Sequence, residues 1–205
     1  MGINNAVRHA IVVLAKAPIR GTVKTRIAAT EGEDRALSIY KELMHCTGRT
    51  LESFHYHVAF TGSPDAGSLK PFFPGAVSFF PQQGETLGPR QINAFLHCIA
   101  LGYGRICLIG CDCPTLAAEQ IAAAFELARL ENDVAIGPAE DGGYYLIAGS
   151  APCLGLFNVD GWGTPKLLAQ TFHAAALLRL RCHFLETKSD IDTYNDFMKW
   201  KTAGR

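Results

Sequence analysis

Residues 10–26 read AIVVLAKAPIRGTVKTR, an apolar segment that passes directly into a loop of basic residues. The run AIVVLA has the length of a fully buried strand. The loop carries four basic side chains and no acidic one, at Lys16, Arg20, Lys24 and Arg26. In α/β proteins, a loop of this kind at the carboxyl end of a strand can hold an anion. We therefore predict an anion site here, with phosphate as the favoured ligand.

A solvated basic turn is the alternative interpretation, because most clusters of charge are only that. The loop is favoured as a site because it follows the most strand-like segment, and because Pro18 and Gly21 restrict its backbone. It is not a Walker loop, since the first glycine of GxxxxGK[ST] is missing and Val23 precedes Lys24 where that motif has glycine.

Composition places the chain among ordinary globular proteins. The 205 residues are 48% hydrophobic with a formal net charge of +0, which predicts one domain over residues 1–205 and neither a nucleic-acid nor a membrane partner. The first ten residues lack the apolar core of a signal peptide. Seven cysteines without a regular framework predict reduced thiols in the cytoplasm. Cys111 and Cys113 could suggest zinc, but no second close pair accompanies them, so they are expected to fill space beside a strand.

Hydrophobic patterning predicts strands and helices in alternation, and hence an α/β fold with a mostly parallel sheet and helices on both faces. After the first strand, further strands are expected over 56–60, 77–80, 105–109, 133–136, 144–148 and 182–185. Helices are expected over 33–53, 90–102 and 164–178, with one more around residues 121–128 and one at the C-terminus.

Asp112 follows the predicted strand over 105–109 directly. A carboxylate at a strand's carboxyl end, facing a cationic loop on another strand, suggests a divalent metal that bridges to phosphate. The alternative is that Asp112 caps the next helix, a role for which Thr115 is the more natural residue. The metal is therefore the favoured hypothesis.

Two further acidic segments are candidates. Asp141-Gly142-Gly143 is typical of a hairpin turn, although its glycines could let a ligand approach the backbone. Asp190 and Asp192 precede the last helix, and either could complete a metal site with Asp112. Thr193 and Asp196 match a helix-capping pattern, which favours a structural role for this region.

Five segments, in this order, resemble a bacterial family of glycosyltransferase-like proteins: AKAPIRGTVKTR, QQGETLGPR, IGCDCP, GPAEDGGYYLI and DIDTYND. That family is similar to the phospholactate guanylyltransferases and, more distantly, to the molybdenum cofactor guanylyltransferases. The resemblance covers about residues 10–197. The chain departs from these relatives in the cysteines that flank Asp112 and in Pro89 before Arg90.

The resemblance implies a nucleotide-diphospho-sugar transferase fold (GT-A-like), a three-layer α/β/α sandwich with a mixed, mostly parallel sheet. It also implies roles for individual residues. The expected phosphate- and nucleotide-binding residues are Lys16, Gly21, Lys24, Thr25, Arg26, Gln83, Gly84 and Arg90. The expected metal ligands are Asp112 with Asp190 or Asp192, and the expected acceptor pocket is formed by Asp141, Gly142, Gly143 and Tyr144.

The leading functional hypothesis is a transferase that depends on Mg²⁺ or Mn²⁺ and moves a glycosyl group from a nucleotide-diphospho-sugar to a small acceptor. Asp141 would act as the base or orient the acceptor, and Lys24 would neutralise charge on the leaving group. The alternative is a nucleotidyltransferase that joins a nucleoside triphosphate to a phosphorylated small molecule with release of pyrophosphate. A nucleotide-binding sensor without catalysis is the third hypothesis, and the acids at 112, 141 and 192 count against it.

Overall fold

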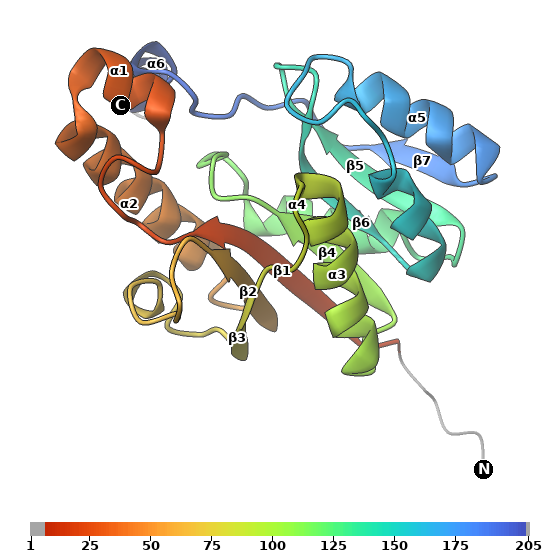
Figure 1. The fold of residues 1–205 in the computed structure, drawn as a ribbon. Helices are drawn as coiled ribbons and strands as arrows, with labels where there is room; N and C mark the ends of the chain where they lie inside the picture. The colour runs from red at the N-terminus through yellow and green to blue at the C-terminus, as the bar shows by residue number, and fades with distance from the viewer. Residues whose placement is uncertain (1–6, 204–205) are drawn as a thin grey trace.

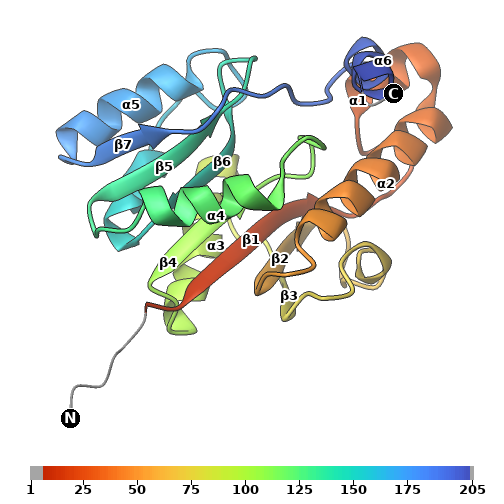
Figure 2. The same cartoon turned by 180° about the vertical axis from the view of Figure 1, so that it is seen from behind.

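The protein is built on one seven-stranded sheet with the strand order β3-β2-β1-β4-β6-β5-β7 (Figures 1 and 2). The computed structural model describes residues 7–203. The strands are β1 (His9–Lys16), β2 (Tyr56–Thr61), β3 (Ser78–Pro81), β4 (Arg105–Ile109), β5 (Asp133–Pro138), β6 (Tyr144–Gly149) and β7 (Arg181–Phe184).

Only β6 runs against its neighbours. It pairs antiparallel with both β4 and β5, whereas the pairings among β3, β2, β1 and β4 and between β5 and β7 are parallel. The predicted mixed, mostly parallel sheet is therefore confirmed. The carboxyl ends of the parallel strands meet the start of β6 along one edge, and this edge is where open α/β sheets bind ligands.

Helices cover both faces of the sheet, as predicted for a three-layer α/β/α fold. They are α1 (Thr25–Glu31), α2 (Glu33–Thr50), α3 (Leu87–Ala100), α4 (Ala118–Leu127), α5 (Leu167–Leu177) and α6 (Tyr194–Ala203), with 3₁₀ turns η1 (Lys70–Phe72) and η2 (Ala151–Phe157). Helices α2 and α4 pack into one buried cluster with Ile11 and Val58, while α3 and α5 pack into the other with Val12 and Ile136. Helix α3 lies in front of the sheet in Figure 1 and α4 in Figure 2.

A smaller core joins α1 and α2 to the C-terminal segment. Ile27 of α1, Ile39 and Leu43 of α2, and Ile191 and Phe197 near α6 form one buried cluster. Helices α1 and α6 therefore lie side by side, as Figure 1 shows. This packing brings the segment before α6 to the carboxyl edge of the sheet, next to the loop that follows β1.

The structure corrects several element boundaries. Helix α1 was not predicted, because it has only seven residues, two of which belong to the cationic loop, and its pattern is too short to identify. Helix α3 begins at Leu87, so the predicted loop residues 87–90 form its first turn. Helix α5 begins at Leu167, not at Thr164, although the Thr164 hydroxyl accepts a hydrogen bond from the Lys166 N–H at 3.3 Å.

The helix after Asp112 is also capped differently from the prediction. Helix α4 starts after Ala117, whose N–H donates to the Gln120 side chain at 3.0 Å, so Thr115 is not the cap. By contrast, the predicted capping pair before α6 is confirmed, because the Asp196 N–H donates to the Thr193 hydroxyl at 3.3 Å and the Thr193 N–H to the Asp196 carboxylate at 2.8 Å.

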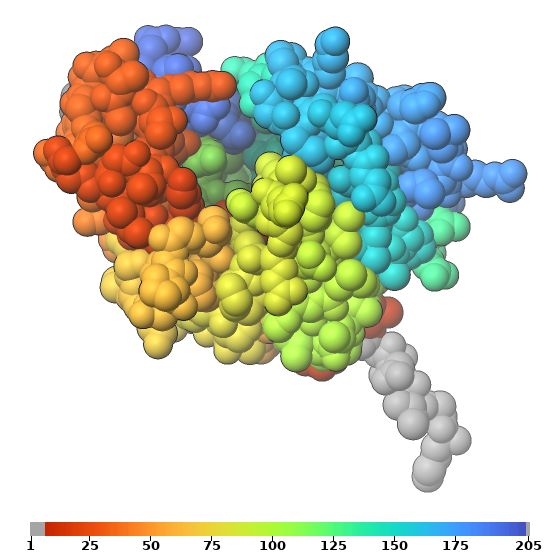
Figure 3. All heavy atoms as spheres, viewed as in Figure 1, coloured from red at the N-terminus to blue at the C-terminus, as the bar shows by residue number. Residues whose placement is uncertain are grey.

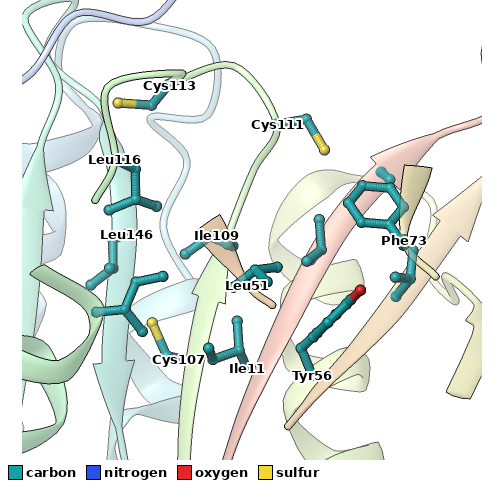
Figure 4. Packing of buried hydrophobic residues seen from close by; sticks show 14 of the residues in the cluster. Ile11, Leu51, Tyr56, Phe73, Cys107, Ile109, Cys111, Cys113, Leu116 and Leu146 are labelled. Atoms are coloured by element: carbon teal, nitrogen blue, oxygen red, sulfur yellow. The ribbon is translucent and has the colours of Figure 1, made fainter. Parts of the chain in front are cut away.

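The cysteines behave as apolar core residues. All seven are free thiols, and Cys111 and Cys113 are buried on the loop after β4 (Figure 4). Burial raises the pKa of both thiols, which keeps them protonated and unreactive at neutral pH. Within residues 7–203, no helix combines the length and the hydropathy that crossing a bilayer requires.

Helix α2 packs closely on η1 at Gly48, and this contact gives a test of the core. A Cβ at Gly48 would lie 2.0 Å from the Phe72 carbonyl oxygen. We expect Gly48→Ala to destabilise the fold by about 1–3 kcal/mol through overpacking, although alanine gains about 1 kcal/mol of helix propensity over glycine. Thermal or denaturant unfolding measures the change. Lys41→Ala, on the exposed side of the same helix, is the control; a Gly48→Ala protein as stable as wild type would contradict this packing.

Candidate active site at the carboxyl edge of the sheet

A cavity of about 380 Å³ opens at the carboxyl ends of β1, β2 and β4. In Figure 3 the surface is hollowed between the orange part of the chain and the yellow-green α3. The polar side chains lining the cavity are Lys16, Thr22, Lys24, Thr25, Arg26, Tyr40, Thr61, Gln82, Arg90, Asp112 and Asp192. Four segments that are distant in sequence thus supply its basic and acidic groups: the loop after β1, the start of α3, the loop after β4 and the segment before α6.

Lys24 is the most constrained residue of this cavity. It has a left-handed backbone (φ 46°, ψ 50°) just before α1, and its side chain is only 6% exposed. Its ammonium Nζ lies 2.6 Å from Asp112 Oδ1 and 3.7 Å from Asp192 Oδ1, and it donates to the Ile191 carbonyl oxygen at 2.5 Å. The Asp112 and Asp192 carboxylates therefore converge on one cationic group.

The remaining cations divide into two groups. Lys16, Arg26 and Arg90 line the cavity, and each is fixed by an oxygen acceptor: Thr22 O at 2.7 Å, Asp192 Oδ2 at 3.0 Å and Gly84 O at 2.9 Å, respectively. Arg20 is not among the lining residues. It pairs with Glu33 and Asp34 of α2, so only part of the cationic loop faces the cavity.

A second cavity of about 250 Å³ adjoins the first and shares Leu14, Leu87 and Asp112 with it. The remainder of its lining is Gln91, Leu108, Ile109, Gly110, Cys113, Tyr144, Tyr145 and Asp190. Because Asp112 lies on the boundary, a ligand that spans both cavities would pass this carboxylate.

Four aspartates gather around this boundary. Burial, together with the neighbouring charges of Asp112, Asp141 and Asp192, raises the pKa of Asp190 to about 7, whereas the Lys24 ammonium opposes the shift. The mutual influence of these groups shows that the loops after β4, β5 and β7 bring their acids close together. A site that concentrates negative charge in this way is suited to cations.

Asp112 and Asp192 are the candidate metal ligands of the first cavity. No group of three or more His, Cys, Asp or Glu side chains in residues 7–203 has an arrangement that could hold a metal ion by itself. Mg²⁺, however, commonly binds through one or two carboxylates together with substrate phosphates and water. Asp112 and Asp192 meet that requirement, because both line the first cavity and already share the Lys24 ammonium.

Several predicted site residues line neither cavity, and their contribution is to the backbone conformation of the neighbouring loops. Gly21 has a positive φ of 75° and lies against Glu33, and the Gly84 carbonyl accepts from Arg90. Gly142 has φ 88° and a Cβ there would meet the Pro165 carbonyl oxygen at 2.3 Å.

Two other predicted positions have structural partners as well. Asp141 is exposed, and its Oδ1 accepts the Gly143 N–H at 2.8 Å, which closes the turn before β6. The Gln83 carbonyl accepts from the Asn93 side chain at 3.0 Å. Of the predicted acceptor residues, Tyr144 lines the second cavity.

Sequence reasoning missed several polar residues of these cavities, among them Tyr40, Gln82 and Gln91. The Tyr40 hydroxyl accepts the Lys16 N–H and donates to the Lys16 carbonyl, both at 3.0 Å, and so fixes the end of β1. The Gln82 side chain donates to Ala59 O at 2.9 Å and to Ala15 O at 3.3 Å. Gln91 is buried in the second cavity. The sequence signal for Tyr40 and Gln91 was a side chain with a polar group on the apolar face of a helix.

Comparison with solved structures supports the fold assignment. The chain superposes with a TM-score of 0.89 and 29% identity on a protein from Desulfovibrio desulfuricans G20, provisionally described as a nucleotide-diphospho-sugar transferase, over 98% of this chain and 89% of that one. The fold is therefore that of the nucleotide-diphospho-sugar transferases.

More distant similarities in fold extend to other solved structures. A nucleotidyl transferase from Methanothermobacter is 16% identical with a TM-score of 0.62, over 94% of this chain and 96% of that one. The Rv0371c protein of Mycobacterium tuberculosis H37Rv, solved as a complex with manganese, is 15% identical with a TM-score of 0.56, over 95% of this chain and 97% of that one. At these identities the likeness concerns the fold alone.

The relation to phospholactate and molybdenum cofactor guanylyltransferases stays a prediction from the motifs. A comparison with curated proteins finds no match. Residues 45–164 match the family model described as "Uncharacterized protein conserved in bacteria (DUF2064)". Because this match spans more than half of its length, the chain belongs to the DUF2064 family.

Proposed function

We propose that this protein is a transferase that uses a nucleotide-activated donor, most simply a glycosyltransferase that takes its sugar from a nucleotide-diphospho-sugar. One observation carries the proposal: two adjoining cavities of opposite character meet at Asp112. The first is lined by Lys16, Lys24, Arg26 and Arg90. The second has carboxylates, a buried amide and apolar walls. Such a pair fits a donor whose diphosphate is charged and whose transferred group is not.

The cationic cavity suits the leaving group. When the bond between the sugar and the diphosphate breaks, negative charge develops on the diphosphate, and fixed positive groups stabilise it without reorganisation. Lys16, Lys24, Arg26 and Arg90 would supply these groups. Asp112 and Asp192 would hold a divalent ion, which supplies Lewis-acid charge neutralisation at the phosphates when bound. Engagement of these carboxylates by a metal would leave the Lys24 ammonium available for the phosphates.

The second cavity suits the group that is transferred. An acceptor hydroxyl attacks the anomeric carbon, its proton passes to a base, and the nucleoside diphosphate leaves. Asp190 lines this cavity at the boundary with Asp112, so we assign it the base role. Asp141 lines neither cavity and its carboxylate closes the turn before β6, so its part in orienting the acceptor stays a prediction from the motif.

Nucleotidyl transfer is the second candidate, favoured by the lysine-bearing loop after β1 and by the similarity in fold to a nucleotidyl transferase. In that reaction a substrate phosphate would attack the α-phosphorus of a nucleoside triphosphate and release diphosphate. A thermal-shift panel of nucleoside triphosphates and nucleotide sugars, with and without Mg²⁺ or Mn²⁺, separates the two. A ligand at about a hundredfold over its Kd adds roughly 2.7 kcal/mol of stability. A metal-dependent shift with a nucleotide sugar supports glycosyl transfer; no shift with any nucleotide overturns both.

The expected role of Lys24 in catalysis can be tested by substitution. Its ammonium is the buried cation of the first cavity, so we expect Lys24→Met to lower turnover by about 10²–10³-fold, as loss of one preorganised charge at a developing anion does. Steady-state kinetics with the donor identified by the panel measures this. Arg20→Met is the matched control, since it removes a cation of the same loop that pairs with α2 instead of the cavity. Equal activity of the two variants would contradict the assigned role of Lys24.

Another prediction separates an enzyme from a binding protein at Asp112. Asp112→Asn keeps the shape but removes the charge shared with Lys24, and we expect it to abolish the metal-dependent part of the thermal shift. Turnover is expected to fall by about 10²-fold or more, since a metal supplies several kcal/mol of charge stabilisation. Asp34→Asn, an exposed carboxylate paired with Arg20, is the control. If Asp112→Asn retains nucleotide binding without metal and the wild type shows no turnover, the protein is a sensor.

A further inference from the structure

We infer that the second cavity accepts an uncharged group bearing hydroxyls, such as a single glycosyl ring, and that Gln91 determines specificity by donating a hydrogen bond to one of these hydroxyls. This inference rests on the proposed use of a nucleotide-activated donor. It specifies the chemical group of the donor or of the acceptor that would lie in the second cavity. It thereby excludes a phosphorylated small molecule as the occupant of this cavity.

Gln91 carries the argument because it is a buried polar side chain with a free donor. Only 5% of the residue is exposed, and it lines the second cavity from the first half of α3. Its Oε1 accepts the Tyr144 hydroxyl proton at 3.0 Å, which fixes the orientation of the amide. Within the described chain, its Nε2 has no hydrogen-bond acceptor. This nitrogen is not among the fully buried unpartnered atoms of residues 7–203, so it is accessible from the cavity, and a ligand oxygen there can accept its hydrogen bond.

The charges of the lining decide the class of ligand. The cavity contains the Asp112 and Asp190 carboxylates, and among residues 7–203 no Lys, Arg or His side chain lines it. The Lys24 ammonium lies at the boundary and is engaged by Asp112. A phosphomonoester in this cavity would bring two negative charges beside the acidic lining, where no basic side chain of the lining can pair with them, which is unfavourable. A hydroxyl, in contrast, can donate to a carboxylate and accept from the Gln91 amide.

The apolar walls and the size of the cavity agree with this assignment. Leu14, Leu87, Tyr144 and Tyr145 form much of the wall and can contact the C–H faces of a ring, as aromatic and aliphatic side chains do in small-molecule sites. The volume of about 250 Å³ lies below the roughly 300–1,000 Å³ of clefts that bind drug-sized ligands. One ring therefore fits better than an oligosaccharide.

The test compares a nucleoside diphosphate with its hexose conjugates. Isothermal calorimetry in the presence of Mg²⁺ would give the Kd of each common nucleoside diphosphate and of its glucose, galactose, mannose and N-acetylglucosamine derivatives. The proteins are wild type, Gln91→Leu and Gln91→Glu. The Glu variant preserves the shape and can still accept from Tyr144, but it cannot donate. Binding of the diphosphate alone reports that each variant is folded and that the first cavity is intact.

We expect wild type to bind a nucleotide-hexose more tightly than the diphosphate, and both variants to lose about five- to tenfold of that preference, the effect of one hydrogen bond. The Kd of the diphosphate should stay within about twofold. A preference that is unchanged in both variants would overturn the role of Gln91. If wild type binds neither the diphosphates nor their conjugates, the proposed function fails, and this inference fails with it.

A second measurement tests the exclusion of phosphorylated ligands. Wild-type protein is incubated with each nucleoside triphosphate, Mg²⁺ and either glucose 1-phosphate or glycerol 3-phosphate, and release of diphosphate is followed. We expect none above the rate without the phosphomonoester. Diphosphate release that depends on the phosphomonoester would overturn the uncharged-ligand assignment while leaving the use of a nucleotide intact.

Discussion

The Lys24 ammonium holds together the edge of the sheet on which the proposed function depends. It contacts Asp112 from the loop after β4 and the Ile191 carbonyl from the segment before α6, so it links the first loop of the chain to two later ones. The residue keeps a left-handed backbone (φ 46°), which is unfavourable by roughly 1–2 kcal/mol for a side chain with a Cβ. Strain of this kind persists only where the surroundings enforce it, and it is concentrated at functional sites.

The core of Ile27, Ile39, Leu43, Ile191 and Phe197 provides that enforcement. These residues dock α1 against α2 and the C-terminal segment, and so bring Asp192 and Ile191 within reach of Lys24. A buried ion pair contributes little net stability, because desolvation offsets much of the attraction. The arrangement is better understood as positioning: apolar packing supplies the free energy, and the charges select the geometry.

The sequence was sufficient to predict the sheet, because long apolar runs and strand-ending Gly and Pro residues identify strands locally. It was sufficient to predict Lys24, Arg26 and Asp112 as neighbours, because the carboxyl ends of parallel strands meet at one edge, whereas Arg90 was predicted from the resemblance alone. It was not sufficient for α1, whose stability comes from contacts with α2 and α6, nor for Gln91 and Tyr40. Their roles depend on hydrogen bonds across 53 and 24 residues of sequence, and no local pattern encodes such partners.

The boundary at Asp112 separates two electrostatic environments within one continuous site. On one side, three basic residues besides Lys24 favour a polyanion; on the other, Asp190 and a buried amide favour hydroxyls. In a nucleotide sugar, the charged diphosphate is joined to the neutral ring at the anomeric carbon. Glycosyl transfer breaks the bond between this carbon and the diphosphate oxygen. A ligand held by both cavities would place that bond near Asp112. The same division disfavours a phosphorylated acceptor, since its charge would fall on the side without cations. The division of charge at Asp112 thus favours a charged leaving group in the first cavity together with an uncharged transferred group in the second.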